Sequence, residues 1–155
     1  MNKSQLKPLL LASLDAEIDA ALAAAQTARE AAAHEDNQPE NKYDTFSLEA
    51  AYLAHGQSER ILGLQQERIQ LARWQVPEFD DDSTVATGAL IELAANGQQR
   101  LIWIALLGGR ILDTDEGNKV QVISQQTPLA ARLRGLGLED VLVLDGVSWE
   151  IVGLQ

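Results

Sequence analysis

Four carboxylates lie close together in the sequence: Glu35, Asp36, Glu40 and Asp44. Carboxylate oxygens are the hard ligands that Mg²⁺ prefers, and Mg²⁺ usually takes only one or two of them from a single protein element. An acidic segment of this kind could complete the coordination of a Mg²⁺ ion that another molecule holds, but would bind the ion poorly by itself. The alternative is that the carboxylates only keep an exposed chain reversal soluble.

The remaining side chains that could do chemistry do not form a recognisable site. The chain has no cysteine, and its two histidines, His34 and His55, do not have the spacing of a metal-binding pair. The three consecutive aspartates at 80–82 are typical of a solvated linker. Residues 113–118 resemble the start of a calcium loop, but the glycine is misplaced and no glutamate closes the loop, so a turn is expected. No nucleophile, phosphate-binding loop or catalytic base is apparent.

Two long helices are expected to hold the acidic segment between them. Residues 6–36 are rich in alanine and contain no glycine, and residues 46–74 show a second helical pattern of apolar residues. Pro39 disfavours helix in the polar stretch between them, where the chain should reverse. Ser4 is the expected N-cap of the first helix. Spacings of three and four predict its seam: Leu11, Leu14, Ile18, Ala21, Ala25, Ala28 and Ala32.

The second half of the sequence changes to short β-type segments separated by turns, so a domain boundary is expected near residues 77–83. Thr127 and Pro128 predict the start of a short helix over 128–133, and Asp145-Gly146 predicts a tight turn. The expected strands are 87–94, 100–107, 119–124, 141–144 and 147–152. The predicted fold class is therefore α+β: an antiparallel α-helical coiled-coil hairpin at 1–76, followed by a small α+β domain at 84–155.

The net charge argues against nucleic acid as a partner, and the length of the apolar runs argues against a membrane-spanning segment. Twelve Lys and Arg against 23 Asp and Glu give a formal net charge of −11, with −4 on residues 1–74 and −7 on residues 75–155. Affinity for nucleic acid comes largely from cationic neutralisation of phosphates, so direct DNA binding is not expected. No apolar run is long enough to cross a membrane. The lack of cysteine is compatible with a cytoplasmic protein.

Three segments give the sequence a resemblance to a known family. Residues 36–43 look like an Asp, Glu-Asn, Tyr signature, residues 127–135 are similar to a Ser-Pro-Leu-Gly/Ala-x-Ala-Leu-x-Gly run, and residues 149–152 look like a Tyr-Glu-Ile-Val ending. Together with the order of the parts, these segments resemble the Gre family of bacterial transcript-cleavage factors.

The resemblance implies a specific partner and mechanism. It implies an FKBP-like second domain docked at the rim of the secondary channel of RNA polymerase, with the coiled coil inserted toward the active site. Asp36 and Glu40 would then help to hold the polymerase's second Mg²⁺, which takes part in cutting backtracked RNA. The chain would need no cofactor of its own, would not itself be an enzyme, and would meet the RNA 3′ end only inside the polymerase complex.

The resemblance also suggests residues for partner binding: Asn41, Tyr43, Thr127, Pro128 and Leu129. The tip departs from the family pattern, because three residues rather than two separate Asp36 from Glu40; Glu35 could equally be the first ligand. The hairpin domain is also acidic where the family carries a basic patch. Two alternatives therefore stay open: a non-cleaving regulator that occupies the same channel, and a structural adaptor or FKBP-like interaction module.

Overall fold

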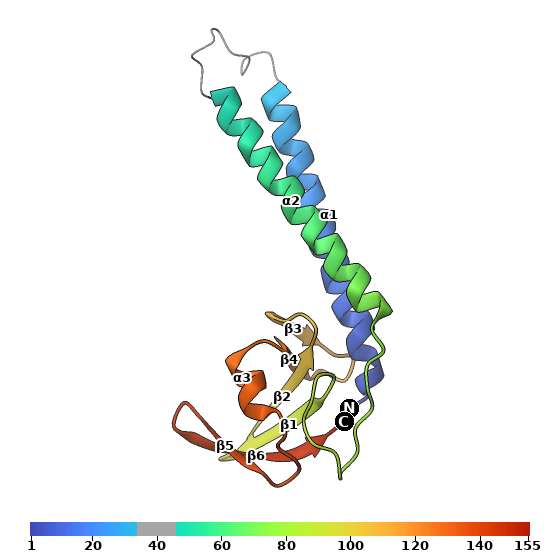
Figure 1. Ribbon diagram of the computed structural model, residues 1–155, viewed down its shortest axis with the longest axis vertical. Coiled ribbons are helices and arrows are strands. Elements are labelled where there is room, and N and C mark those ends of the chain that lie inside the picture. Colours follow the sequence, from blue (N-terminus) through green and yellow to red (C-terminus); the bar gives the residue numbers. More distant parts are fainter. Residues whose placement is uncertain (34–45) are drawn as a thin grey trace. The chain divides into compact units, whose positions relative to one another are not determined.

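The computed structural model describes residues 1–33 and 46–155, which form two compact units (Figure 1). The first, which we call the sheet unit, comprises Met1–Leu10 with Trp74–Gln155. The second, which we call the helical unit, comprises Leu11–Arg73. The domains predicted from the sequence, 1–76 and 84–155, assign the first ten residues differently. The α+β fold class is confirmed, because two long helices precede a six-stranded sheet.

The first long helix, α1 (Leu6–Ala33), follows a single 3₁₀ turn, η1 (Lys3–Gln5). The side chain of Asn2 caps this turn by accepting hydrogen bonds from the Ser4 backbone N–H at 3.0 Å and from the Ser4 hydroxyl at 2.7 Å. The prediction that Ser4 is the N-cap is therefore wrong. Asn2 supplies the acceptor because its backbone is extended and its amide oxygen reaches the Ser4 N–H in the first turn.

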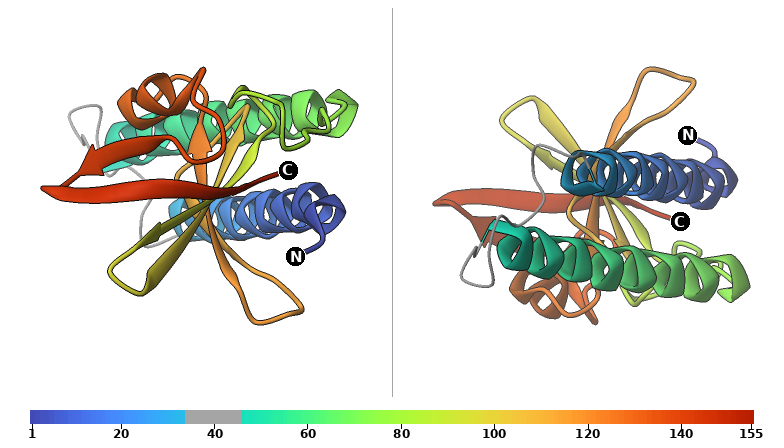
Figure 2. Two further views of the ribbon diagram at one scale, coloured as in Figure 1. Left: turned by 90° about the horizontal axis from the view of Figure 1, so that it is seen from below. Right: turned by 90° about the horizontal axis from the view of Figure 1, so that it is seen from above.

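The second helix, α2 (Phe46–Arg73), lies beside α1 (Figures 1 and 2). Each helix has 28 residues, and a single apolar stripe on each is buried. On α2 the buried residues of this stripe are Ile61, Leu64 and Leu71. On α1, the predicted seam is buried at Leu14, Ile18 and Ala25 and half-buried at Leu11, Ala21 and Ala28, while the side chain of Ala32 lies outside the described residues.

Six strands form one mixed sheet in the order β3-β4-β2-β1-β6-β5. Only β2 and β4 run parallel; the other neighbouring strands are antiparallel. The strands are β1 (Leu90–Ala95), β2 (Gln98–Ala105), β3 (Arg110–Asp113), β4 (Lys119–Ser124), β5 (Val141–Leu144) and β6 (Val147–Leu154). Strands are present at all five predicted places: β4 and β5 have the predicted bounds, and β1, β2 and β6 have shifted ends. Strand β3 is an additional strand that the sequence did not predict.

The main hydrophobic core lies on one face of this sheet, where alternate strand residues meet the short helix α3 (Pro128–Leu133). Both faces of the central strands are buried, so β2 ends in four consecutive buried residues. On the opposite face Trp103 is fully buried; its ring stacks on Trp74 with 5.8 Å between centroids, and its Nε1–H donates to Gly88 O at 3.1 Å. Trp74 thus fixes the end of the linker against the sheet of its own unit.

Two predicted turns are present. Asp145 and Gly146 both have positive φ, 50° and 78°, as a tight hairpin between β5 and β6 requires. Residues 113–118 form the expected turn, closed by hydrogen bonds from Thr114 N to Asn118 O and from Gly117 N to Thr114 O. No described helix is both long and apolar enough to cross a membrane.

Candidate functional site

The acidic segment, residues 34–45, lies between the two long helices in the sequence. α1 ends at Ala33 and α2 begins at Phe46, so Asp36, Glu40 and the partner-binding candidates Asn41 and Tyr43 lie outside the described residues, as does the alternative ligand Glu35. Their roles stay predictions. The structure does describe the elements that present them: the two helices whose ends flank the segment.

Ion pairs hold these two helices in an antiparallel arrangement. The guanidinium of Arg68 on α2 donates to both carboxylate oxygens of Asp15 on α1, from Nε to Oδ1 and from Nη2 to Oδ2, the latter at 3.0 Å. Arg60 Nη2 donates to Glu17 Oε1 at 3.1 Å. As the residue number rises on α1 it falls on α2, so the chain reversal at 34–45 joins neighbouring helix ends.

The bidentate pair also shifts both acid–base equilibria. Hydrogen bonding from Arg68, reinforced by its charge, lowers the pKa of Asp15, and the Asp15 carboxylate raises the pKa of Arg68. Both groups are exposed enough to be screened by solvent, so the pair contributes more to register than to stability.

The cationic side chains of the helical half are largely engaged within the chain. Besides the two arginine pairs, Lys3 Nζ donates to Pro77 O and Lys7 Nζ to Trp74 O, each at 2.6 Å. Lys42 lies outside the described residues. The seven Lys and Arg of residues 1–74 are Lys3, Lys7, Arg29, Lys42, Arg60, Arg68 and Arg73. Four of the six described Lys and Arg of residues 1–74 are therefore engaged in contacts within the chain.

The second motif, at 127–135, builds α3. The Thr127 side chain accepts from Ala130 N at 3.2 Å and its hydroxyl donates to Ser124 O at 2.9 Å, so Thr127 is the N-cap, as predicted. A cap of this kind contributes about 1 kcal/mol. Gly135, with φ 83°, ends the segment, and its N–H donates to Val85 O at 2.9 Å.

The three candidate contact residues of this motif have different environments. Pro128 is exposed at the first helical position, Thr127 is half-buried in its capping role, and Leu129 is half-buried against the sheet core. The structure thus gives each of them a local structural role. Pro128 is the most accessible of the three to a partner, and partner binding by this group stays a prediction.

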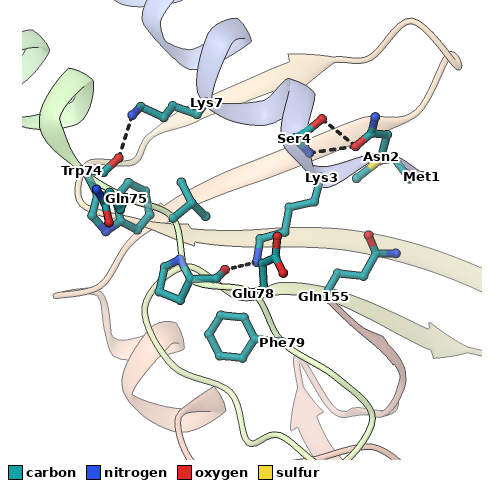
Figure 3. A pocket seen from close by; sticks show the side chains of 12 residues that line it. Met1, Asn2, Lys3, Ser4, Lys7, Trp74, Gln75, Glu78, Phe79 and Gln155 are labelled. Atoms are coloured by element: carbon teal, nitrogen blue, oxygen red, sulfur yellow. Dashed lines mark hydrogen bonds between the residues drawn. The ribbon is translucent and has the colours of Figure 1, made fainter.

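The sequence did not indicate a pocket that the structure shows in the sheet unit (Figure 3). Its volume is about 610 Å³, and its walls include Lys3, Lys7, Trp74, Pro77 and Phe79. The Lys3 ammonium lies 4.6 Å above the centre of the Phe79 ring. Burial lowers the pKa of Lys3 to about 8, and the nearby Glu78 carboxylate only partly offsets this. The aromatic residues after the second helix are the one signal in the sequence that could have indicated it.

No resident metal site is found among residues 1–33 and 46–155: nowhere in them do three His, Asp or Glu side chains gather closely enough to share an ion. The aspartates at 80–82 are exposed, and Asp80 forms a local turn with Ser83, whose N–H donates to Asp80 O at 3.1 Å. This agrees with the solvated linker expected there.

No protein-family model matches the chain, and no curated protein sequence matches it. Solved structures do align with it. GreA factor homolog 1 (Gfh1) of Thermus thermophilus has a TM-score of 0.38 and 18% sequence identity over 94% of each chain. Thermus aquaticus Gfh1 has a TM-score of 0.38 and 18% identity over 92% of this chain and 91% of that one.

A third solved structure is the prokaryotic transcription elongation factor GreA/GreB from Nitrosomonas europaea. Its TM-score is 0.34 with 18% identity, over 73% of this chain and 94% of that chain. All three carry Gre-type names, the family that the sequence segments resemble.

Proposed function

We propose that this chain is a Gre-type elongation factor that binds in the secondary channel of RNA polymerase and stimulates Mg²⁺-dependent cleavage of backtracked RNA. The observation that carries the proposal is the antiparallel helix pair whose neighbouring ends flank the acidic segment 34–45. At 1.5 Å per residue, each 28-residue helix is about 42 Å long. Such a pair can carry carboxylates far into a narrow channel.

The residue types suit this role. The side chains of Asp36 and Glu40 offer the hard oxygen ligands that Mg²⁺ prefers, and either Glu35 or Asp36 can serve as the first. A second Mg²⁺ in a two-metal reaction orients the attacking oxygen and neutralises charge on the phosphate. This chain's part is to present the carboxylates; the polymerase holds the ion and remains the catalyst, in the cytoplasm.

One observation favours a second candidate function, a channel-occupying regulator without cleavage activity. Arg60 and Arg68 are paired with Glu17 and Asp15, so they are already engaged within the helix pair instead of forming a basic surface for RNA. Such a regulator would use the same helix pair and the same partner, but would not accelerate RNA cleavage.

A cleavage assay separates the two functions. Purified protein is added to backtracked elongation complexes with Mg²⁺, and release of short 3′ RNA fragments is followed over time. The proposal predicts faster release, and loss of the acceleration in the variant Asp36→Ala/Glu40→Ala with polymerase binding unchanged. The matched control is Asp19→Ala, which removes an exposed carboxylate from α1 and should cleave normally.

Polymerase binding is measured in parallel by co-sedimentation. Binding without acceleration supports the non-cleaving regulator, and competition with an authentic cleavage factor would locate it in the channel. Absence of binding contradicts both functions and leaves the structural adaptor or FKBP-like module.

A further inference from the structure

The second helix carries a second, partly apolar stripe, on the side away from its buried seam. The seam residues Ile61, Leu64 and Leu71 are at most 8% exposed. The second stripe, which we call the outer stripe, keeps a strict spacing of four and three over six steps. It consists of Leu48, Tyr52, His55, Glu59, Leu62, Gln66 and Ile69. All seven are exposed, so within the described residues nothing covers them.

The four large apolar members of the outer stripe are about half exposed or more. Leu48 is 54% exposed, Tyr52 69%, Leu62 58% and Ile69 48%. Aligned apolar residues on one helix face mark an interaction surface, whereas single scattered ones do not. These four residues fall on a and d positions of one heptad frame, with Tyr52 at an a position and Leu62 at a d position; the remaining positions of the frame are polar.

The flanks of the stripe are also those of a helix interface. Of the eight flanking positions only Glu49 is charged; the other seven are Ala51, Gly56, Ser58, Gly63, Gln65, Gln70 and Ala72. A Cβ added at Gly56 or Gly63 would meet nothing within 4 Å. Among the residues that the structure describes, nothing packs against the two glycines, and they would allow another helix to approach closely.

From this pattern we propose that the outer stripe binds the outer stripe of a second copy of this chain in antiparallel orientation. A parallel pair would place Glu59 against Glu59 of the second copy, and like charges at close range repel. In an antiparallel pair an a position faces a d position. One such register places Tyr52 opposite Leu62 of the second copy and His55 opposite Glu59 of the second copy, twice by symmetry.

Polar complementarity selects this register over its neighbours, because an imidazole N–H of His55 can donate to the Glu59 carboxylate of the second copy. Shifting by one heptad places Glu59 opposite Leu62 in one direction and opposite Leu48 in the other, so that the carboxylate faces an apolar partner. Within one copy, His55 Nε2 lies 3.7 Å from Glu59 Oε1, so the imidazole and the carboxylate are already close to each other. In the selected register both gain the complementary group of the second copy.

The first test is the oligomeric state of the full chain, measured by sedimentation equilibrium up to about 200 µM, because self-association depends on concentration. We expect a monomer–dimer equilibrium. Leu62→Glu should raise the dissociation constant at least about tenfold, since it places a charge in the apolar layer. Leu53→Glu is the matched control: Leu53 is 68% exposed but lies off the stripe, so its substitution should leave the equilibrium unchanged.

The second test reads the register. Because the chain has no cysteine, single introduced cysteines give an unambiguous signal. In a glutathione redox buffer, an equal mixture of His55→Cys and Glu59→Cys proteins should form the mixed disulfide in excess over both symmetrical ones. Leu53→Cys should cross-link only at background level. Helical circular dichroism at 222 nm confirms that each variant is folded.

Specific outcomes overturn the inference. A monomer at every concentration contradicts it, and so does a preference for symmetrical disulfides, which would indicate a parallel pair. If the chain is monomeric and Leu62→Glu instead weakens polymerase binding, the outer stripe belongs to the polymerase interface. The inference does not depend on the proposed function, since it needs no polymerase, and either can fail alone.

Discussion

Lys3 is the described residue whose chemistry departs most from that of a free side chain. Burial lowers its pKa to about 8 from 10.5, so roughly half of its amine is neutral at pH 8. An ordinary lysine is under about 1% neutral at that pH. We expect acetylation by N-hydroxysuccinimide acetate at pH 8 to modify Lys3 about tenfold faster than exposed Lys119, even though Lys3 is partly buried.

The pH dependence of this labelling has a definite sign. The rate at Lys3 should rise as the pH increases from 7, with an inflection near pH 8, because the neutral amine is the reactive form. Peptide mapping by mass spectrometry assigns the modified residue, and the Lys3→Arg protein confirms the assignment by losing that peptide signal. Labelling of Lys3 that is slower than that of Lys119 throughout this pH range would contradict the shifted equilibrium.

At the scale of elements, the Asp15–Arg68 pair joins α1 to α2. Because the pKa of Asp15 is lowered in the fold, the pair stabilises the folded state above the pKa of an unfolded Asp, near 4. This contribution is lost as the pH falls through the lowered folded value. We expect Asp15→Asn to lower the melting temperature at pH 7 and to have a progressively smaller effect as the pH approaches 2.

Thermal unfolding followed by circular dichroism at 222 nm measures this difference. Asp19→Asn is the control, because Asp19 is an exposed carboxylate on the same helix, and its substitution should change the melting temperature less. An Asp15→Asn effect that is independent of pH would mean that the substitution acts through packing, not through the ion pair.

The sequence predicted both long helices, the short helix α3 and five of the six strands. Long helical periodicity located α1 and α2, since apolar residues recur over many turns. Strand β3 was not predicted because its four residues, Arg-Ile-Leu-Asp, include only two apolar ones. Strand β5 is equally short and also lies at a sheet edge, but its sequence is Val-Leu-Val-Leu and the Asp145-Gly146 turn signal follows it. Local sequence does not specify such a strand; its pairing with β4 does. Local sequence also does not show why residue 108 is a glycine. The reason is its close contact with the end of β4: an added Cβ would lie 2.2 Å from Ser124 N.

In the candidate site, too, local features were predictable from the sequence and long-range ones were not. The Thr127 cap was predictable because capping is local, involving a side chain and an N–H three residues on. The pocket around Lys3 was not, because it brings together residues more than 70 positions apart. The outer stripe of α2 is not distinguishable from the buried seam in the sequence, because both contribute apolar residues to the same helical segment.

At the scale of the whole molecule, negative charge is spread over both units. The sheet unit holds seven Lys and Arg against twelve Asp and Glu, net −5, and the helical unit five against eleven, net −6. Like charges repel over a Debye length, about 10 Å at 0.1 M salt, and this repulsion destabilises the compact state. Exposed ion pairs, which salt weakens, contribute little by comparison.

Salt should therefore stabilise both units. Raising NaCl from about 0.02 to 0.2 M is expected to stabilise each by about 1 kcal/mol, which corresponds to a rise in melting temperature of ~4–8 °C for units of this size. The units can be followed separately: all three tryptophans, Trp74, Trp103 and Trp149, belong to the sheet unit, whereas the ellipticity at 222 nm reports mainly on the long helices.

The variant Asp81→Asn/Asp82→Asn should reduce the salt response of the tryptophan signal and leave that of the helical signal unchanged, because both aspartates are exposed members of the sheet unit. If salt lowered both transitions instead, the ion pairs between charged side chains would outweigh the repulsion, and Asp15→Asn would then abolish most of the salt response of the helical unit.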